Sequence, residues 1–280
     1  MSSETRFAAI RKTTEAPAGP ALGQWSQFVG LYARELLRTF RNPWVLLITV
    51  VQPFMWLLFF GSSFANVPLA ELDALLHTHI QSYLQFLLPG TLSTSMLSVG
   101  MFGSMSTIQD KRFGYMKRIL LTPTRRATVY LAKALGSATR GIVQIPIMVA
   151  AALIFGVRFQ GDPVLWAAWV LGLVLLGFGF ACMFLAVTAS SSDWQTPGVI
   201  SNFITMPLMF ASSSLFPATN FPAWMQTIAN WNPVSYSALF GRDILVMGVV
   251  HWNYLGYLAL FAAIMCIVGT LVASRYLKAE

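Results

Sequence analysis

Charged side chains are scarce in this sequence of 280 residues. Asp, Glu, Lys and Arg together make up 10% of it, whereas 56% is hydrophobic; soluble domains carry about 25% charged residues. So few charges could not cover the surface of a water-soluble fold. The bilayer must therefore be the solvent for much of the chain, and we expect an all-α integral membrane protein.

The motifs of catalysis and of metal binding are missing too. The sequence has no phosphate loop of the form G-x-x-x-x-G-K-[ST] and no H-E-x-x-H. Its two cysteines, Cys182 and Cys266, lie inside apolar runs and fit neither a disulfide framework nor a metal site. Asp and Glu are almost absent from these runs, which argues against a proton-driven carrier. We therefore expect no catalytic residue, metal or cofactor on this chain, and an energy source that lies elsewhere.

Six apolar runs reach roughly the 20 residues that a membrane-spanning helix needs. Lys and Arg gather before the first run, between the second and third, and after the sixth, whereas residues 65–82 contain none. By the positive-inside rule, both termini and the 109–128 loop are then cytosolic. This topology accounts for the net charge of +8 without a nucleic-acid partner. The expected spans are about 44–64, 83–107, 129–155, 164–190, 197–216 and 253–274.

Residues 1–24 are polar and lack the apolar core of a signal peptide, so we expect a flexible cytosolic tail there, followed by one transmembrane domain over 25–280. Within that domain, residues 25–41 have the pattern of an amphipathic helix. Such a helix lies in the membrane interface, where its arginines meet anionic lipid. A polar extension of the first span is the alternative. The apolar positions at helical spacing include Trp25, Phe28 and Tyr32, and the opposite, basic side includes Arg34 and Arg38.

A second amphipathic segment lies in the basic loop between the second and third spans. Phe113, Met116 and Leu120 recur at i, i+3 and i+7, with basic residues around them. This spacing predicts a short helix parallel to the membrane that ends near Pro123. A solvated positive loop is the alternative, but such a loop has no need of an ordered apolar face.

The segment before the last span is apolar but broken by proline. Three prolines divide residues 217–247 into pieces too short to cross the membrane. We expect two re-entrant half-helices, about 222–230 and 233–247, each beginning at a proline. A seventh span is the alternative, but it would place the basic residues Arg275 and Lys278 outside.

Three charged residues in or beside the apolar runs need partners. Arg140 lies about two turns into the third run, where it can bond to Gln144 or extend toward the cytosol. Arg242 and Asp243 lie toward the outer side, where they can pair with each other.

Four segments, taken in order, carry a family resemblance that covers nearly the whole chain. They are the amphipathic helix, the run Tyr83–Gly90, the loop with Gly114, Arg118–Pro123, Arg126 and Leu131–Lys133, and Phe216-Pro217 followed by Phe221–Trp224, Asn232-Pro233 and Arg242. Together they resemble the membrane subunit of a type-2 ATP-binding-cassette (ABC) exporter, in the daunorubicin-resistance-like branch of permeases. The resemblance implies a six-span subunit that supplies none of the ATP chemistry itself.

The resemblance also implies two protein partners. A separate ABC ATPase subunit would bind ATP and Mg²⁺, and a second permease subunit, expected to be another copy of this chain, would complete a dimer in membrane lipid. The coupling helix that docks on the ATPase would contain Asp110, Phe113, Gly114, Met116, Arg118, Leu120, Thr122 and Pro123. The cargo pathway between the subunits would follow spans one, two and five, along Phe54, Trp56, Phe59, Met101, Met105, Phe203, Met206 and Phe210. Aromatic and methionine side chains suit amphipathic cargo.

The expected function is that of the permease in an ATP-driven exporter of the cell inner (cytoplasmic) membrane. It would move an amphipathic drug, lipid or lipid-linked cargo out of the cytosol or inner leaflet. A stand-alone channel would need a charged ring or a filter loop, and an intramembrane enzyme would need a convergent catalytic set. The nearest alternative is a polysaccharide or O-antigen-type exporter permease, because spans two and five also offer the hydroxyls of Ser93, Thr94, Ser95, Ser98, Ser201 and Thr205.

Overall fold

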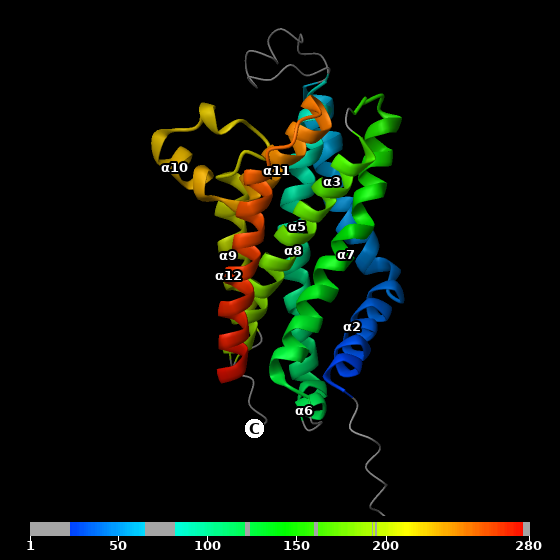
Figure 1. Cartoon of the computed structure of the whole chain (residues 1–280), viewed down its shortest axis with the longest axis vertical. Helices are drawn as coiled ribbons and strands as arrows, with labels where there is room; N and C mark the ends of the chain where they lie inside the picture. The colour runs from blue at the N-terminus through cyan, green and yellow to red at the C-terminus, as the bar shows by residue number, and fades with distance from the viewer. Residues whose placement is uncertain are drawn as a thin grey trace, which may run out of the picture.

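The computed structural model describes residues 23–64, 82–120, 124–159, 162–191, 193 and 195–276. Within these residues the regular structure is helical and contains no strand, which confirms the all-α prediction. The long helices stand side by side along one axis (Figure 1). In chain order the elements are α2 (Gln24–Phe40), α3 (Pro43–Ser63), α5 (Tyr83–Arg112), α6 (Tyr115–Leu120), α7 (Arg126–Ile154), α8 (Pro163–Ser190), α9 (Thr196–Phe210), η1 (Ala218–Asn220), α10 (Ala223–Trp231), α11 (Pro233–Arg242), η2 (Asp243–Met247) and α12 (Trp252–Tyr276).

Four helices within the described residues, α5, α7, α8 and α12, are long and apolar enough to cross a membrane. They correspond to four of the six expected spans. The other two expected spans coincide with α3, whose apolar part is Leu47–Ser63, and with α9, which has 15 residues. The count of six spans, and the division into a cytosolic tail and one transmembrane domain, stay predictions.

Helix α5 occupies the centre of the bundle. It packs against α3, α7, α8 and α11, and most of its residues are buried. Helix α12 lies on the outside against α8 and leaves apolar side chains such as Leu260 and Ile267 exposed. Because exposed apolar surface is stable in hydrocarbon rather than in water, this surface itself indicates a membrane.

Proline and asparagine determine several helix starts. Proline has no backbone N–H, and the first turn of a helix needs none, so it costs little there. Asn232 accepts the N–H of Val234 at 3.0 Å and so caps α11. The same side chain donates to the carbonyl oxygens of Leu208 at 2.7 Å and Ala211 at 2.9 Å, which fastens α11 to the end of α9. The prolines within the first turn of a helix are Pro43, Pro163, Pro197 and Pro233.

The segment between α9 and α12 forms two short helices where the sequence predicts them. Helix α10 begins just after Pro222, and α11 continues into the π-helical turn η2, which ends before Gly248 in a left-handed conformation with φ of 65°. In Figure 1, α10 projects from the bundle near the end opposite α6, while α11 lies among the long helices. Re-entry of this segment into the membrane stays a prediction.

Arg242, at the end of α11, is buried without an ion pair among the described residues. Its Nε donates to the carbonyl oxygen of Phe86 at 3.1 Å, and its Nη2 donates to that of Ser214 at 2.8 Å. Asp243 Oδ2 lies 2.7 Å from Nδ1 of His251 instead. The expected pairing of Arg242 with Asp243 is therefore wrong, because successive residues of a helix point about 100° apart.

Gly90 of α5 gives a test of this packing. A Cβ on Gly90 would lie 1.9 Å from the carbonyl oxygen of Ser214. We expect Gly90→Ala to displace the backbone around Ser214 and to lower the free energy of unfolding by about 1–3 kcal/mol. The measurement is the thermal unfolding temperature of the purified protein, which should fall. The matched control is Gly256→Ala in α12, where no atom lies within 4 Å, and it should be neutral or slightly stabilising. Equal unfolding temperatures for Gly90→Ala and the unmodified chain would contradict the close contact.

Candidate functional site

Helix α2 packs on the bundle with its polar side and exposes its apolar side. Its buried residues are Glu35 and Thr39. A surface helix of a soluble protein shows the reverse arrangement, whereas an outward apolar side suits a helix at a membrane surface. The predicted amphipathic helix is confirmed; its place in the membrane interface stays a prediction. The large apolar residues that are 44–76% exposed are Trp25, Val29, Leu37 and Phe40.

The aromatic and basic residues predicted for this helix occupy two regions. Trp25, Phe28 and Tyr32 stack in sequence along α2, and the Tyr32 hydroxyl lies 2.9 Å from Oγ1 of Thr139 in α7. Arg34 and Arg38 turn toward α5. The arginines therefore bind protein carboxylates rather than only lipid headgroups.

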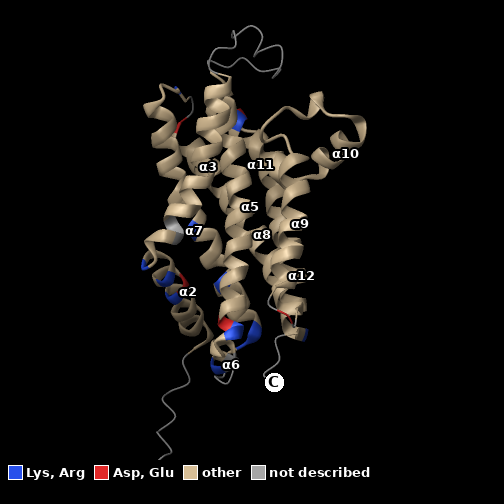
Figure 2. Cartoon of the chain, turned by 180° about the vertical axis from the view of Figure 1, so that it is seen from behind, with Lys and Arg blue, Asp and Glu red and all other residues tan. Residues whose placement is uncertain are grey.

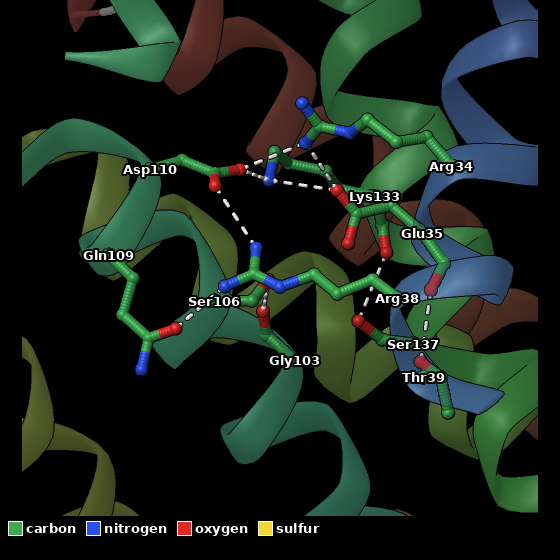
Figure 3. A network of polar contacts seen from close by, with 10 residues as sticks. All are labelled: Arg34, Glu35, Arg38, Thr39, Gly103, Ser106, Gln109, Asp110, Lys133 and Ser137. Atoms are coloured by element: carbon green, nitrogen blue, oxygen red, sulfur yellow. Dashed lines mark hydrogen bonds and ion pairs between the residues drawn. The ribbon is translucent and has the colours of Figure 1, made fainter. Parts of the chain in front are cut away.

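A cluster of five charged residues joins α2, α5 and α7 (Figure 3), and we call it the charged cluster: Arg34, Glu35, Arg38, Asp110 and Lys133. Asp110 Oδ2 accepts from Arg34 Nη2 at 3.0 Å and from Lys133 Nζ, and its Oδ1 accepts from Arg38 Nη1 at 3.0 Å. Glu35 Oε1 accepts from Arg34 Nη2 at 2.8 Å and from Lys133 Nζ at 3.2 Å. One carboxylate of α5 thus holds two residues of α2 and one of α7.

The charged cluster depends on mutual neutralisation. Glu35, Asp110 and Lys133 are all buried, and a buried ion costs several kcal/mol unless it is paired and hydrogen-bonded. Burial alone would raise the pKa of Glu35, but Lys133 and Arg34 outweigh it and hold this pKa below its ordinary value of 4.5. Ionised Glu35 therefore stabilises the fold above that ordinary value, and its contribution is lost as the pH falls through the lowered pKa.

Two further contacts extend the charged cluster. Arg38 Nη2 donates to Gln109 Oε1 at 2.7 Å, and Arg140 Nε donates to Thr39 Oγ1 at 3.1 Å. Of the two expectations for Arg140, the bond to Gln144 is wrong, because α2 packs beside α7 and Thr39 is the acceptor; Gln144 Nε2 instead lies 3.9 Å from the sulfur of Met96. Extension of Arg140 toward the cytosol stays a prediction.

The predicted coupling segment forms a turn and a short helix. Helix α5 continues through Asp110 to Arg112, Gly114 adopts a left-handed φ of 69°, and α6 begins at Tyr115. Glycine adopts this φ without a steric penalty, which accounts for its place at the break. The predicted continuous helix is therefore wrong in this region.

The side chains of the coupling segment point in different directions. Phe113 is 75% exposed in the turn, whereas Met116 is buried against residues such as Tyr130. The expected common apolar face therefore does not include Phe113. Arg118 is exposed on α6. The side chain of Leu120, together with Thr122 and Pro123, lies outside the described part of the chain.

Two basic residues fasten the ends of the helices around this turn. Lys111 Nζ donates to the carbonyl oxygens of Thr188 at 2.7 Å and of Ala189 and Ser191 at 3.2 Å, where α8 ends. Arg126 Nη1 donates to the carbonyl oxygen of Ser274 at 3.0 Å, near the end of α12. A cation at a helix C-terminus satisfies carbonyls that have no partner within the helix. Figure 2 shows Lys and Arg gathered around α6, α2 and this end of α5.

The residues predicted to line the cargo pathway lie on α3, α5 and α9, and α5 contacts both of the other helices. Phe203 is 80% exposed, whereas Met101 is buried and its sulfur lies 3.8 Å from the Thr205 hydroxyl. The other exposed members are Phe59, Met206 and Phe210, and the half-buried ones are Phe54, Trp56 and Met105. The structure thus brings part of the set to an outer surface and leaves part in the core.

Sequence reasoning missed two central groups, Glu35 and Lys133. Glu35 was overlooked because the sides of the amphipathic helix were assigned from apolar spacing, and Lys133 was used only for topology and for the family resemblance, without a partner. A carboxylate and an ammonium within largely apolar segments need partners, and that requirement could have identified them. Within the described ranges, no group of three or more His, Cys, Asp or Glu side chains could hold a metal ion.

Comparisons with known proteins agree on one family. A family model described as "ABC-2 type transporter" matches residues 26–246. The daunorubicin resistance ABC transporter permease protein DrrB1 of Streptomyces coeruleorubidus is 26% identical over 207 residues, which cover 72% of this chain and 69% of that protein. A transport permease named ycf38 from Pyropia yezoensis is 27% identical over 209 residues, covering 74% and 69%. The inner membrane transport permease YadH of Escherichia coli K12 is 24% identical over 213 residues, covering 76% and 80%.

Removal of the shared carboxylate tests the charged cluster. Asp110→Asn removes the negative charge that Arg34, Arg38 and Lys133 share. We expect this change to lower the free energy of unfolding by about 3 kcal/mol. The matched control is Asp162→Asn, at an exposed residue before α8 whose side chain makes no cap hydrogen bond, and it should change stability by less than about 0.5 kcal/mol. Thermal unfolding of the purified variants measures both effects. Equal shifts for the two variants would show that Asp110 does not hold the helices together.

Proposed function

The chain belongs to the ABC-2 type transporter family and is a membrane permease subunit of an ABC exporter, and we propose that it exports an amphipathic drug, lipid or lipid-linked molecule. The family match and the four long apolar helices identify a multi-pass membrane protein. The relative DrrB1 is named for resistance to daunorubicin. A cargo taken from the cytosol or the inner leaflet is consistent with that name.

The exposed apolar surface on α3 and α9 is the observation that supports an amphipathic cargo. Phe59 on α3 and Phe203, Met206 and Phe210 on α9 flank the central helix α5, and aromatic and methionine side chains adapt to varied apolar shapes. These residues, with Phe54, Trp56, Met101 and Met105, form our proposed pathway.

A polysaccharide cargo is less well supported by the hydroxyl groups near this surface. Ser93 and Ser95 are buried, and each donates to a carbonyl oxygen of its own helix. Thr94 and Ser98 also donate within α5. Because these four donors are already used, the four hydroxyls could bind sugar hydroxyls only as acceptors. A polysaccharide or O-antigen-type exporter permease stays the second candidate.

The α5–α6 turn is our proposed docking site for a separate ABC ATPase subunit. Phe113 and Tyr115 project there as exposed aromatic residues, which often act as anchors in protein interfaces. The turn lies among the basic residues that also support a cytosolic location. On this proposal ATP and Mg²⁺ bind to the ATPase subunit, and the remaining coupling residues position the turn.

A dimer in the inner (cytoplasmic) membrane completes the proposal. The second permease subunit would be another copy of this chain and would cover the apolar surface of α3 and α9, so that the pathway runs between the copies. Both termini and the α5–α6 turn would be cytosolic, six helices would cross the membrane, and α10 and α11 would re-enter it from the outer side. Nucleic acid has no role in this proposal.

The contacts of the α5–α6 turn suggest how ATP-driven motion would spread. Lys111 and Arg126 connect this region to the ends of α8 and α12, and Asp110 connects it to α2 through Arg34 and Arg38. A push on the turn by the closing ATPase would therefore move α2 and several spans together, because ion pairs and hydrogen bonds transmit displacement over short distances.

Phe113 provides the test of ATPase docking. In purification from native membranes, we expect the unmodified chain to retain a stoichiometric subunit with a G-x-x-x-x-G-K-[ST] motif, identified by mass spectrometry. Phe113→Asp should reduce its recovery at least about fivefold, because the change puts a charge in place of an apolar anchor. The matched control is Phe155→Asp, at an exposed phenylalanine after α7. Full recovery with Phe113→Asp would exclude this turn as the contact, and absence of any such subunit would favour a stand-alone channel.

Phe59 provides the test of the pathway. We expect Phe59→Ala to change the ratio of initial transport rates for a cationic and a neutral fluorescent amphiphile by at least about threefold in membrane vesicles supplied with ATP, because pocket shape sets such ratios. Expression and recovery of the ATPase subunit should stay unchanged. Leu260→Ala, at an exposed residue of α12 on another side of the bundle, is the control. An unchanged ratio for Phe59→Ala would remove Phe59 from the pathway.

A further inference from the structure

A cavity of about 290 Å³ lies between α2, α3, α5 and α7, at the basic end of the bundle. Two arginines from different helices line it, Arg38 of α2 and Arg140 of α7. Ser106 of α5 adds a hydroxyl group, and Ile48 of α3 adds an apolar wall. The cavity thus combines two guanidinium groups with both polar and apolar surface. Of its lining residues, only Met105 belongs to the proposed cargo pathway.

Arg140 is the least neutralised cation that faces this cavity. The residue is only 7% exposed, and its one hydrogen bond to a described residue runs from Nε to Thr39 Oγ1 at 3.1 Å. Within the described part of the chain, no carboxylate lies within ion-pair distance of Arg140. Its two terminal amino groups carry four N–H donors that the surrounding described side chains leave unused. A buried guanidinium in this state lacks the partner that such a charge needs.

The charged cluster attracts Arg140 through Glu35 but does not pair with it at ion-pair distance. Its two carboxylates, Glu35 and Asp110, already accept hydrogen bonds from Arg34, Arg38 and Lys133. With Arg140 included, four cations face two carboxylates across α2, α5 and α7, which leaves an excess of two positive charges. An anion in the cavity would reduce this excess where the low dielectric constant makes the interaction strong.

Phosphate is the anion that fits these donors. A planar guanidinium group binds phosphate oxygens through two parallel N–H bonds, and Arg140 has its terminal amino groups available for this. Arg38, whose Nη1 and Nη2 bind Asp110 and Gln109, adds a second positive charge to the same space. The volume lies at the lower end of the range for ligand pockets, about 300–1,000 Å³, so it suits a headgroup rather than a whole cargo molecule.

An apolar stripe continues from the rim of the cavity along α3. Ile48, Val51 and Met55 follow one another at intervals of three or four residues, so they lie on one side of the helix, and they are 37–57% exposed. An acyl chain would lie along this stripe while its headgroup enters the cavity. A soluble phosphate compound would leave the stripe unused.

We infer that this cavity binds the phosphate headgroup of an anionic phospholipid, with Arg140 as the phosphate ligand, Arg38 as a second positive charge and the Ile48–Met55 side of α3 as the acyl-chain contact. The site is separate from the α5–α6 turn. Lipid binding here is measured without ATP, cargo or ATPase, so its failure would leave the proposed export function intact.

The test is a titration of the purified, delipidated full chain, followed by native mass spectrometry. The probes are dioleoylphosphatidylglycerol, dioleoylglycerol, which lacks the phosphate, and glycerol 3-phosphate, which lacks the acyl chains. We expect phosphatidylglycerol to bind at least about tenfold more tightly than either of the others. Arg140→Gln should remove at least about tenfold of this affinity, in line with the loss of a charge-assisted bidentate contact.

The matched control is Arg125→Gln, at an exposed arginine just before α7, and it should bind phosphatidylglycerol as the unmodified chain does. If Arg140→Gln does not fold, Ile48→Gln at the exposed rim takes its place and should weaken phosphatidylglycerol binding at least about threefold without changing glycerol 3-phosphate binding. Unchanged phosphatidylglycerol affinity in the folded variant would overturn the site. Equal affinity for glycerol 3-phosphate would assign the phosphate chemistry to a soluble ligand and overturn the lipid assignment.

Discussion

The carboxylate of Asp110 is the group on which the arrangement of this end of the bundle depends. It accepts hydrogen bonds from Arg34 and Arg38 of α2 and from Lys133 of α7, so three helices from separate parts of the chain meet at one side chain. Asp110 also lies one turn before Gly114, where the direction of the chain changes. The position of α2, the depth of α7 and the direction of the α5–α6 turn are therefore connected through one negative charge in a region of low dielectric constant.

Much of the architecture follows from the apolar runs in the sequence. Helices α5, α7, α8 and α12 coincide with predicted spans, and α10 and α11 begin beside the prolines that predicted them. These features are local, because the length of an apolar run and the missing N–H of proline act within one segment. The amphipathic pattern of α2 was also visible, and so was the family resemblance, which the match to the ABC-2 type transporter family confirms.

The errors concern contacts between segments. Arg140 bonds to Thr39 of α2 rather than to Gln144, and Arg242 bonds to backbone carbonyls rather than to Asp243. In both places sequence reasoning chose a partner nearby in the chain, whereas the closest acceptor comes from another element. Phe113 and Met116 do not share the predicted apolar face for a related reason: the left-handed residue Gly114 breaks the helix between them. Periodicity assumes a continuous helix, and a single backbone break removes that assumption.

The reversed burial of α2 also has an evolutionary consequence. A soluble helix is constrained on its apolar side, where volume and shape must match a packed core. In the predicted interfacial position, the outward apolar side of α2 meets lipid, which accepts any side chain of sufficient hydrophobicity, whereas Glu35 and Thr39 meet partners with fixed geometry. Substitutions between relatives should therefore accumulate among the hydrophobic residues of this helix and spare its polar ones. In more distant sequences, a helix that keeps its hydrophilic residues while its hydrophobic residues vary would indicate that its polar side packs on the bundle as that of α2 does.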